Sequence, residues 1–294
     1  MPASTSVLTP PSPPLTTIDK RSGLSQRELL AEYIEPGLPV VLTDATRHWG
    51  AMGKFTPAFF KKQYGHLTKT INGQTYSMAE VADLILTSSP ENPAPYPFNL
   101  NIERHFPELL ADMQPEVIFG KSDRLKHPLL PKLMLRGTEV YELFLGGNGA
   151  GFPYLHFDAL CMNTQITQLY GSKEFILYSP DQTPYLYPRP DNAKVSQVNT
   201  KAPDYESFPL FRQAKPVSVM VEEGETILFP AKWWHTTRIH EASISMGRAH
   251  LNERNWTAFN QDNFELRRQK HPAVALATLA YGKVLGHLLD FQNK

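Results

Sequence analysis

The sequence predicts a mainly β protein with flanking helices, built on a double-stranded β-helix, or jelly roll. Between residues 139 and 249, short β-prone segments follow one another closely, and the turn at 222–225 joins two of them as a hairpin. The segments before and after this region have helical period or are interrupted by proline. Short antiparallel strands at close spacing are typical of double-sheet jelly rolls. We therefore expect a jelly-roll core with N-terminal α/β elements and C-terminal helices.

The N-terminal part is interpreted as scaffold. Residues 1–17 carry five prolines among Ser and Thr, and we expect a disordered tail there. Ser25 begins a helix, because Glu28 three residues later completes a capping-box pattern. Residues 39–42 are predicted to form a short buried strand, and a second helix is predicted over 56–64, with proline at its first helical position.

The next segment leads from this scaffold to the β region. The pair Asn72-Gly73 predicts a hairpin turn, and residues 78–86 have helical period. Four prolines between 90 and 97 keep the following stretch extended, and this brings Tyr96 to the edge of the β region. A short helix is predicted over 108–113.

The β region carries the predicted core. Its strands are predicted at 140–145, 164–170, 175–178, 217–221, 226–229, 234–239 and 243–249. This arrangement suggests a jelly roll of the cupin kind. The predicted domain covers 18–260, and residues 261–294 form a C-terminal helical segment. Apolar residues between 272 and 291 recur at three- and four-residue steps, which indicates an amphipathic helix. Its apolar face either packs on the barrel or pairs with a second copy to form a homodimer.

Composition sets limits on the class of protein. The chain has 294 residues, of which 41% are hydrophobic and 20% charged, and its formal net charge is zero. This is an ordinary globular composition, and the charge balance does not indicate nucleic acid as an obligate partner. The single cysteine, Cys161, cannot form an intramolecular disulfide, which fits a reducing compartment. With no run of eighteen apolar residues, we expect a cytoplasmic or nuclear protein without a membrane span.

His156 and Asp158 are the first candidates for a functional site. A strand places residues i and i+2 on the same face, so this imidazole and this carboxylate point into the same space. His235, which follows two tryptophans, supplies a second imidazole from a distant strand. Two histidines and one carboxylate make the facial triad that holds Fe(II) and leaves the other coordination positions open.

Three more residues are candidates for the same site. Lys173 follows Gly171 at the start of a strand, where a lysine is more often solvated than functional. Asn163 lies seven residues after the first histidine of the triad, and Tyr96 comes from the proline-rich segment. Their role depends on their lying near the triad.

The sequence around these residues resembles the JmjC-type, cupin-fold 2-oxoglutarate oxygenases. The nearest likeness is to the hydroxylase branch, which contains the asparaginyl hydroxylase of the hypoxia-inducible factor. Three blocks carry the resemblance, in the order in which the family has them, and with weaker similarity it covers most of 20–260. They are 156–188 with His-Phe-Asp and Gly-Ser-Lys, 203–209 with Pro-Asp-Tyr, and 223–235 with Gly-Glu and Trp-Trp-His.

The resemblance implies a complete site with Fe(II), 2-oxoglutarate as co-substrate, and O2. Lys173 falls where the family has the lysine that binds the distal carboxylate of 2-oxoglutarate, and Tyr96 where a tyrosine hydroxyl supports that carboxylate. Asn163 resembles the asparagine near the proximal carboxylate. Charge-assisted hydrogen bonds of this kind are strong, which agrees with these roles. The iron ligands that the resemblance implies are His156, Asp158 and His235.

The chain departs from the family pattern in two places near the site. The segment between the carboxylate ligand and the lysine is a residue or two longer, and we expect a β-bulge near Asn163 to absorb the extra length. Pro153 stands where the family often has Thr or Ser in contact with the co-substrate. That contact is expected either to be absent or to come from another residue, Tyr154 or Thr164.

The function that the resemblance implies is an Fe(II)- and 2-oxoglutarate-dependent dioxygenase that hydroxylates a protein side chain. Lysine demethylation of the JmjC kind, and hydroxylation of RNA or of a small molecule, are the alternatives within this chemistry. Two alternatives belong to other classes. A cupin with another metal and reaction, such as an isomerase, needs neither Lys173 nor Tyr96, and a non-catalytic cupin binding module needs no intact triad.

A polypeptide is the expected substrate, held extended across the mouth of the barrel. The loops 146–154 and 185–216 flank the ligands in sequence and are rich in Gly, Pro and aromatic residues. Loops of this kind on a rigid barrel usually carry recognition. The aromatic residues of the second loop either line a groove or pack the loop on the barrel; they are Tyr185, Tyr187, Tyr205 and Phe208.

Overall fold

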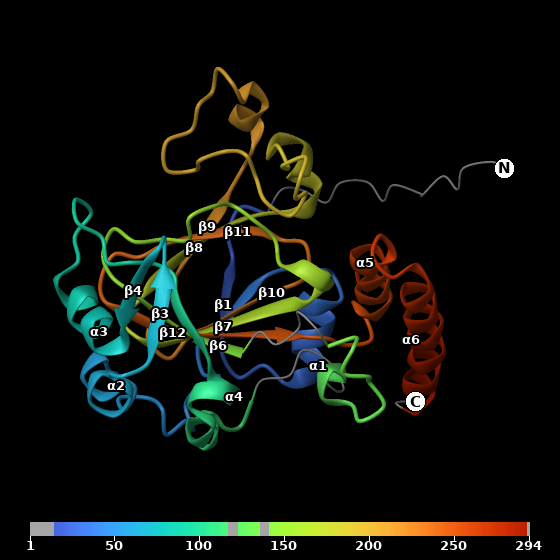
Figure 1. The fold of residues 1–294 in the computed structure, drawn as a ribbon, viewed down its shortest axis with the longest axis horizontal. Coiled ribbons are helices and arrows are strands. Elements are labelled where there is room, and N and C mark those ends of the chain that lie inside the picture. Colours follow the sequence, from blue (N-terminus) through green and yellow to red (C-terminus); the bar gives the residue numbers. More distant parts are fainter. Residues whose placement is uncertain (1–14, 117–122, 136–140, 293–294) are drawn as a thin grey trace.

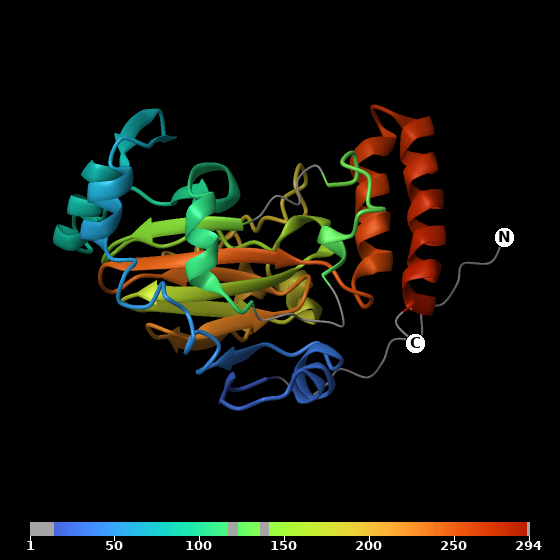
Figure 2. The same cartoon turned by 90° about the horizontal axis from the view of Figure 1, so that it is seen from below.

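The structure is a computed structural model that describes residues 15–116, 123–135 and 141–292. Two β-sheets lie at its centre, with small helices at one end and a pair of longer helices at the other (Figures 1 and 2). Most of the N-terminal tail that was predicted to be disordered lies outside the described residues. The mainly β fold with a jelly-roll core and flanking helices is as the sequence predicted.

The larger sheet has the strand order β1-β2-β10-β7-β12-β6-β5 within the described residues. Its neighbouring strands are antiparallel, except for the parallel pair β1 and β2. The long central strands β7 and β12 are almost wholly buried, because both of their faces are covered. The strands are β1 (Asp19–Arg21), β2 (Val40–Leu42), β5 (Phe98–Asn101), β6 (Tyr141–Gly146), β7 (Asn163–Tyr170), β10 (Thr226–Phe229) and β12 (Ser243–His250).

The smaller sheet faces the larger one and has the order β11-β8-β9. It consists of β11 (Trp234–Arg238), β8 (Lys173–Tyr178) and β9 (Val217–Val221). The chain at His156 extends this sheet by one residue pair. The backbone N–H of His156 donates to the carbonyl of His235 at 3.1 Å, and the N–H of His235 donates back at 2.6 Å.

The N-terminal elements follow local sequence signals. Ser25 and Glu28 form the predicted capping box at the start of α1 (Gln26–Leu29). The predicted turn at Asn72-Gly73 joins β3 (Thr68–Ile71) to β4 (Gln74–Ser77). The short helix predicted over 108–113 is a 3₁₀ helix, Pro107–Met113, because prolines restrict both of its ends. The other helices here are α2 (Pro57–Tyr64), α3 (Met78–Thr87) and α4 (Ile102–His105).

Helices α5 (Trp256–Arg268) and α6 (Pro272–Gln292) pack side by side at the other end of the barrel (Figure 2). Leu285 and Leu289 of α6 are buried in one cluster with Trp256 and Phe259 of α5. The same cluster includes residues of β12 and of the chain before β7. One face of α6 therefore packs against the rest of the protein, but it is not the apolar face that the sequence predicted, whose residues Tyr281, Val284, Leu288 and Phe291 are exposed.

The opposite face of α6 is exposed and apolar. Its exposed residues include Leu276 (62%), Val284 (61%), Leu288 (52%) and Phe291 (79%). The segment Pro272–Phe291 has a mean hydropathy of 1.3, and 28% of its most apolar stretch is buried. By length and composition alone it could cross a membrane. The sequence had been interpreted as containing no such segment. Core helices of soluble proteins pass the same test, so this criterion is weak.

We expect Leu288→Asp to weaken self-association of the protein. A second copy placed on this apolar face would bury it, and homodimers with twofold symmetry are the commonest closed assembly. Light scattering should find a wild-type dimer and a monomeric variant. The matched control is Leu266→Asp, on α5, where the side chain is 55% exposed. A wild-type monomer, or a dimer that Leu288→Asp leaves intact, would exclude α6 from the interface.

Candidate active site

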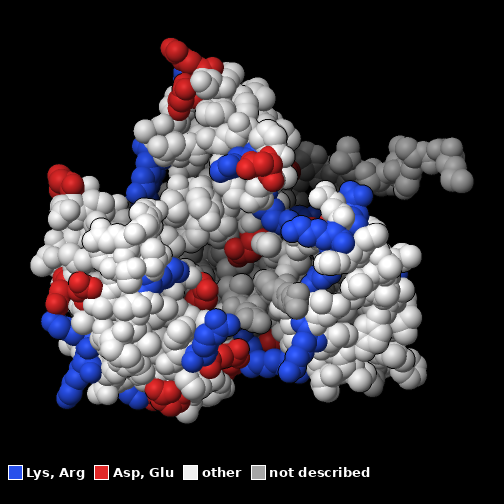
Figure 3. Space-filling model, viewed as in Figure 1, with Lys and Arg blue, Asp and Glu red and all other residues white. Residues whose placement is uncertain are grey.

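A cavity of about 240 Å³ lies between the two sheets. Each strand contributes residues two apart, because alternate side chains of a strand share one face. Figure 3 shows a hollow near the middle of one face, with acidic side chains beside it and basic side chains farther out. The lining pairs are Glu142 and Phe144 of β6, Thr164 and Ile166 of β7, Lys173 and Phe175 of β8, His235 and Thr237 of β11, and Ser245 and Gly247 of β12.

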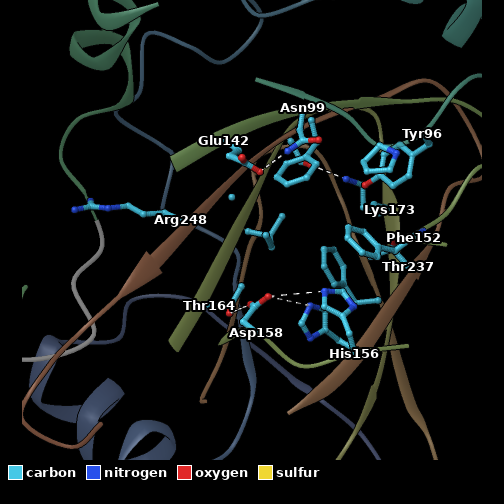
Figure 4. A pocket seen from close by; sticks show the side chains of 17 residues that line it. Tyr96, Asn99, Glu142, Phe152, His156, Asp158, Thr164, Lys173, Thr237 and Arg248 are labelled. Atoms are coloured by element: carbon cyan, nitrogen blue, oxygen red, sulfur yellow. Dashed lines mark hydrogen bonds and ion pairs between the residues drawn. The ribbon is translucent and has the colours of Figure 1, made fainter. Parts of the chain in front are cut away.

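The three predicted metal ligands come together on one side of this cavity (Figure 4). Oδ1 of Asp158 lies 3.8 Å from Nε2 of His156 and 4.0 Å from Nε2 of His235. One ligand atom from each residue lies within 4.8 Å of the other two. The backbone pairing of the two histidines aligns their rings, whose centres are 4.3 Å apart. Three donors on one side of an ion leave its other positions open.

The protonation states of these ligands favour a metal ion. Burial, and then the neighbouring His235, lower the pKa of His156, so its imidazole is neutral. Burial alone would raise the pKa of Asp158, but the two imidazoles and a hydrogen bond from Thr164 hold it below its usual value. Nδ1 of His235 lies 3.1 Å from the carbonyl of Trp233, which leaves Nε2 directed at the cavity. Neutral imidazoles and an ionised carboxylate are the forms that bind metals.

Strand β7 presents Thr164, not Asn163, to this site. The hydroxyl of Thr164 donates to the carboxylate of Asp158. Asn163 lies on the opposite face of the strand, where its Oδ1 accepts from the backbone N–H of Ala231 at 3.1 Å. The structure therefore does not place Asn163 at the predicted co-substrate contact. Thr164 is one of the two residues that were expected to make the co-substrate contact in place of Pro153.

The extra length before Lys173 is accommodated elsewhere than predicted. A 3₁₀ turn, Ala159–Cys161, directly follows the carboxylate ligand, and Leu160 in this turn has a φ of 61°. The pairing of β7 with β12 is regular at Asn163, so the bulge predicted there is wrong. The register shifts at the far end of β7 instead, between Ile244 and Ser245 of its partner.

Lys173 lies at another end of the cavity and is 3% exposed. Its Nζ donates to the hydroxyl of Ser245 at 2.5 Å and lies 5.7 Å from the ring centre of Tyr96 and 5.8 Å from that of Phe144. In the part of the chain that the structure describes, no carboxylate pairs with this lysine. Burial lowers the pKa of Lys173 to about 7. An anionic ligand gains the most binding free energy where it meets a buried amine that has no counter-ion.

Tyr96 reaches the same end of the cavity from the proline-rich segment. Burial raises the pKa of its phenol, which is hydrogen-bonded with Thr237, so the phenol is a neutral hydrogen-bonding group. The ring of Phe152 meets Tyr96 edge-on at 6.4 Å and stacks on His156 at 4.4 Å. An aromatic wall thus connects the lysine end of the cavity with the triad.

The aromatic residues of the 185–216 connection pack the connection itself. Tyr187 contacts Phe208 with ring centres 5.0 Å apart, and Tyr205 stacks on Phe211 at 6.2 Å. The predicted groove residues Tyr185, Tyr187, Tyr205 and Phe208 do not line the cavity. Packing on the barrel is therefore the alternative that the structure favours.

A model of the family described as cupin-like domain matches residues 69–256, which contain every residue of this site. The chain belongs to the cupin-like domain family. Twenty-seven known proteins resemble it significantly, and three show the range. Lysine-specific demethylase JMJ30 of Arabidopsis thaliana is 27% identical over 248 residues, and lysine-specific demethylase 8 of Xenopus tropicalis is 25% identical over 247 residues. The tRNA wybutosine-synthesizing protein 5 of Gallus gallus is 29% identical over 147 residues.

These matches cover unequal parts of the proteins. The demethylase matches include 78% and 79% of this chain, but 53% and 52% of the relatives. The match to the tRNA wybutosine-synthesizing protein includes 50% of this chain and 40% of the relative. The chain thus spans about half the length of the two relatives named as demethylases.

The residues of the cupin-like site fit a metal ion. Two donor atoms that each lie about 2.1 Å from one ion, at a right angle, are about 3 Å apart. The two distances from Asp158 to the histidines, 3.8 and 4.0 Å, exceed this by about 1 Å or less, so small side-chain rotations would bring the donors onto one ion. Two nitrogens and one carboxylate oxygen are the donor set that non-haem Fe(II) prefers. The uncompensated amine of Lys173 and the phenol of Tyr96 would suit a carboxylate at the other end.

Proposed function

We propose that the protein is an Fe(II)- and 2-oxoglutarate-dependent oxygenase that hydroxylates a protein side chain. One observation carries the proposal: a His-Asp-His group and a buried lysine without a counter-ion lie in one cavity. A metal site alone would suit many cupin-like proteins. A dicarboxylate co-substrate needs a second, cationic site at a distance from the metal, and Lys173 provides it.

Each residue has a defined part in this proposal. His156, Asp158 and His235 would hold Fe(II), which when bound supplies the redox chemistry that couples decarboxylation of 2-oxoglutarate to hydroxylation. Thr164 fixes the carboxylate of Asp158 through its hydrogen bond. Lys173 and Tyr96 would orient the distal carboxylate of 2-oxoglutarate, and the half-buried aromatic wall would limit the access of water.

A polypeptide is the substrate class that the comparisons support best. Two matches that each cover more than three quarters of this chain are to proteins named for demethylation of lysine. Lysine demethylation is therefore the second candidate function. It uses the same site, since hydroxylation of an N-methyl carbon releases that carbon as formaldehyde. The match to a tRNA-modifying protein covers a smaller part of the chain.

The experiment is an incubation of a peptide library, with and without methylated lysines, with Fe(II), 2-oxoglutarate and O2. We expect release of succinate and, by mass spectrometry, peptides that have gained one oxygen. Loss of a methyl group instead would favour demethylation. If no peptide changes while a small metabolite raises succinate release well above background, the polypeptide proposal fails and the oxygenase proposal stands. If 2-oxoglutarate neither binds nor is consumed, both fail.

A further inference from the structure

The residues assigned to metal and co-substrate account for only part of the cavity wall. In the larger sheet, Ser245 pairs with Phe144, and Gly247 pairs with Glu142. Lys173 contacts Ser245, so the pair of Ser245 and Phe144 belongs to the co-substrate end of the cavity. The pair of Gly247 and Glu142 lies two residues farther along the same two strands. Figure 4 shows Glu142 across the cavity from the triad.

The carboxylate of Glu142 is held in place from one side. The side-chain nitrogen of Asn99 donates to Oε2 of Glu142. Lys69 fixes the orientation of this amide, because its Nζ donates to the side-chain oxygen of Asn99 and, at 3.1 Å, to its backbone carbonyl. Among the residues that the structure describes, no hydrogen bond or ion pair reaches the other oxygen, Oε1, of Glu142. That oxygen is available to a ligand in the cavity.

The basic residues of the cavity wall do not neutralise Glu142 by contact. Arg248 is paired with Asp123 at 2.7 Å and with Glu116. Lys173 contacts Ser245, which belongs to the neighbouring residue pair. Glu142 is thus the carboxylate outside the triad that faces the cavity without a contacting cation, within the described residues. The nearby ammonium of Lys69 interacts with it through space but bonds to Asn99. The aromatic wall favours the same kind of ligand, since ring faces attract cations.

We propose that Glu142 is a specificity-determining residue that selects a cationic side chain of the polypeptide substrate, either a protonated amine or a guanidinium. The proposal rests on the proposed oxygenase function and adds the charge of the group that is presented to the metal. A charge-assisted hydrogen bond to Glu142 would hold that group at the wall that lies across the cavity from the triad. A phosphodiester would be repelled by Glu142, which argues against a nucleic-acid substrate.

The test compares ligands of equal shape and different charge. N-acetylarginine amide is compared with the neutral N-acetylcitrulline amide. N-acetyllysine amide (with a free side-chain amine) is compared with N-acetyl-2-aminoheptanoic amide, in which a methyl group replaces the ammonium. Each is titrated into wild-type protein loaded with Mn(II) and 2-oxoglutarate. We expect the cation of at least one pair to bind more than about tenfold more tightly than its neutral partner. Equal affinities within both pairs would overturn the proposal.

Variants assign this preference to one residue. Glu142→Gln keeps an oxygen that accepts from Asn99 but removes the charge, and it should abolish most of the preference. Glu142→Met, which fills similar volume, should do the same if the glutamine variant folds poorly. Glu174→Gln is the matched control on the outer face of β8 and should keep the preference. A preference that survives both changes at Glu142 would exclude this residue as its source.

The same titrations separate this proposal from the one it rests on. If 2-oxoglutarate does not bind to the Mn(II)-loaded wild type, the oxygenase proposal fails. If 2-oxoglutarate binds and the cationic probes show no advantage, only the role of Glu142 fails.

Discussion

His156→Ala is expected to abolish Fe(II) binding while the fold is kept. The variant removes one of three ligands, and the loss of affinity should exceed the roughly 10–100-fold cost of losing an outer-shell partner. The fold should survive because the hydrophobic clusters that hold the two sheets together do not include His156. Anaerobic titration with Fe(II), or with Mn(II) followed by electron paramagnetic resonance, measures the affinity. Far-UV circular dichroism and thermal unfolding report on the fold.

His240→Ala is the matched control for this variant. His240 is 53% exposed and pairs with Glu174 at 3.1 Å, outside the cavity. The His240→Ala variant should bind Fe(II) as the wild type does. If His156→Ala also binds Fe(II) with wild-type affinity, the triad is not the metal site of this protein.

The sequence predicted the parts of the fold that depend on local signals. The capping box at Ser25 and the turn at Asn72-Gly73 are made within a few residues of chain, and both are found as predicted. The pairing order of the strands depends on contacts between distant residues. No pattern in the sequence shows that β10 lies between β2 and β7. The start of α5 was not predicted, because its buried face includes asparagines rather than an apolar stripe.

The candidate site divides in the same way. The triad was predictable because the alternation of a strand links His156 to Asp158 and because the motif around His235 is distinctive. Asn163 was misplaced by one residue. Its assignment came from the resemblance, whereas strand alternation from Asp158 puts Thr164, six residues later, on the inward face. A shift of one residue along a strand reverses its face.

Several contacts of the site were missed because single polar residues in buried strands give little signal alone. Ser245 contacts Lys173, and Thr237 is hydrogen-bonded with Tyr96. Thr237 lies two positions after the ligand His235, so strand alternation would have identified it. Ser245 lies two positions before Gly247, which also lines the cavity. Glu142 had no such reference, because its strand carries no ligand.

Lys173→Met is expected to cost most of the affinity for 2-oxoglutarate. Removing one partner of a buried charge pair costs about 3–5 kcal/mol, which is more than about 100-fold in affinity. Methionine matches the lysine stem in volume, so the cavity should keep its shape. The unliganded variant should be at least as stable as the wild type, because the wild type buries this amine without a counter-ion. Titration of 2-oxoglutarate into Mn(II)-loaded protein measures the affinity, and thermal unfolding measures the stability.

The pH dependence of the same titration identifies the amine as the source of the effect. Burial lowers the pKa of Lys173 to about 7, so the free protein carries a neutral amine above this pH and an ammonium below it. A bound carboxylate favours the ammonium, and binding above pH 7 must therefore take up a proton. Wild-type affinity should be constant below pH 7 and fall by up to about tenfold for each pH unit above it. Lys173→Met should show no such slope. An affinity within about threefold of wild type in this variant, or a wild-type profile without the decline, would exclude Lys173 as the co-substrate's cation.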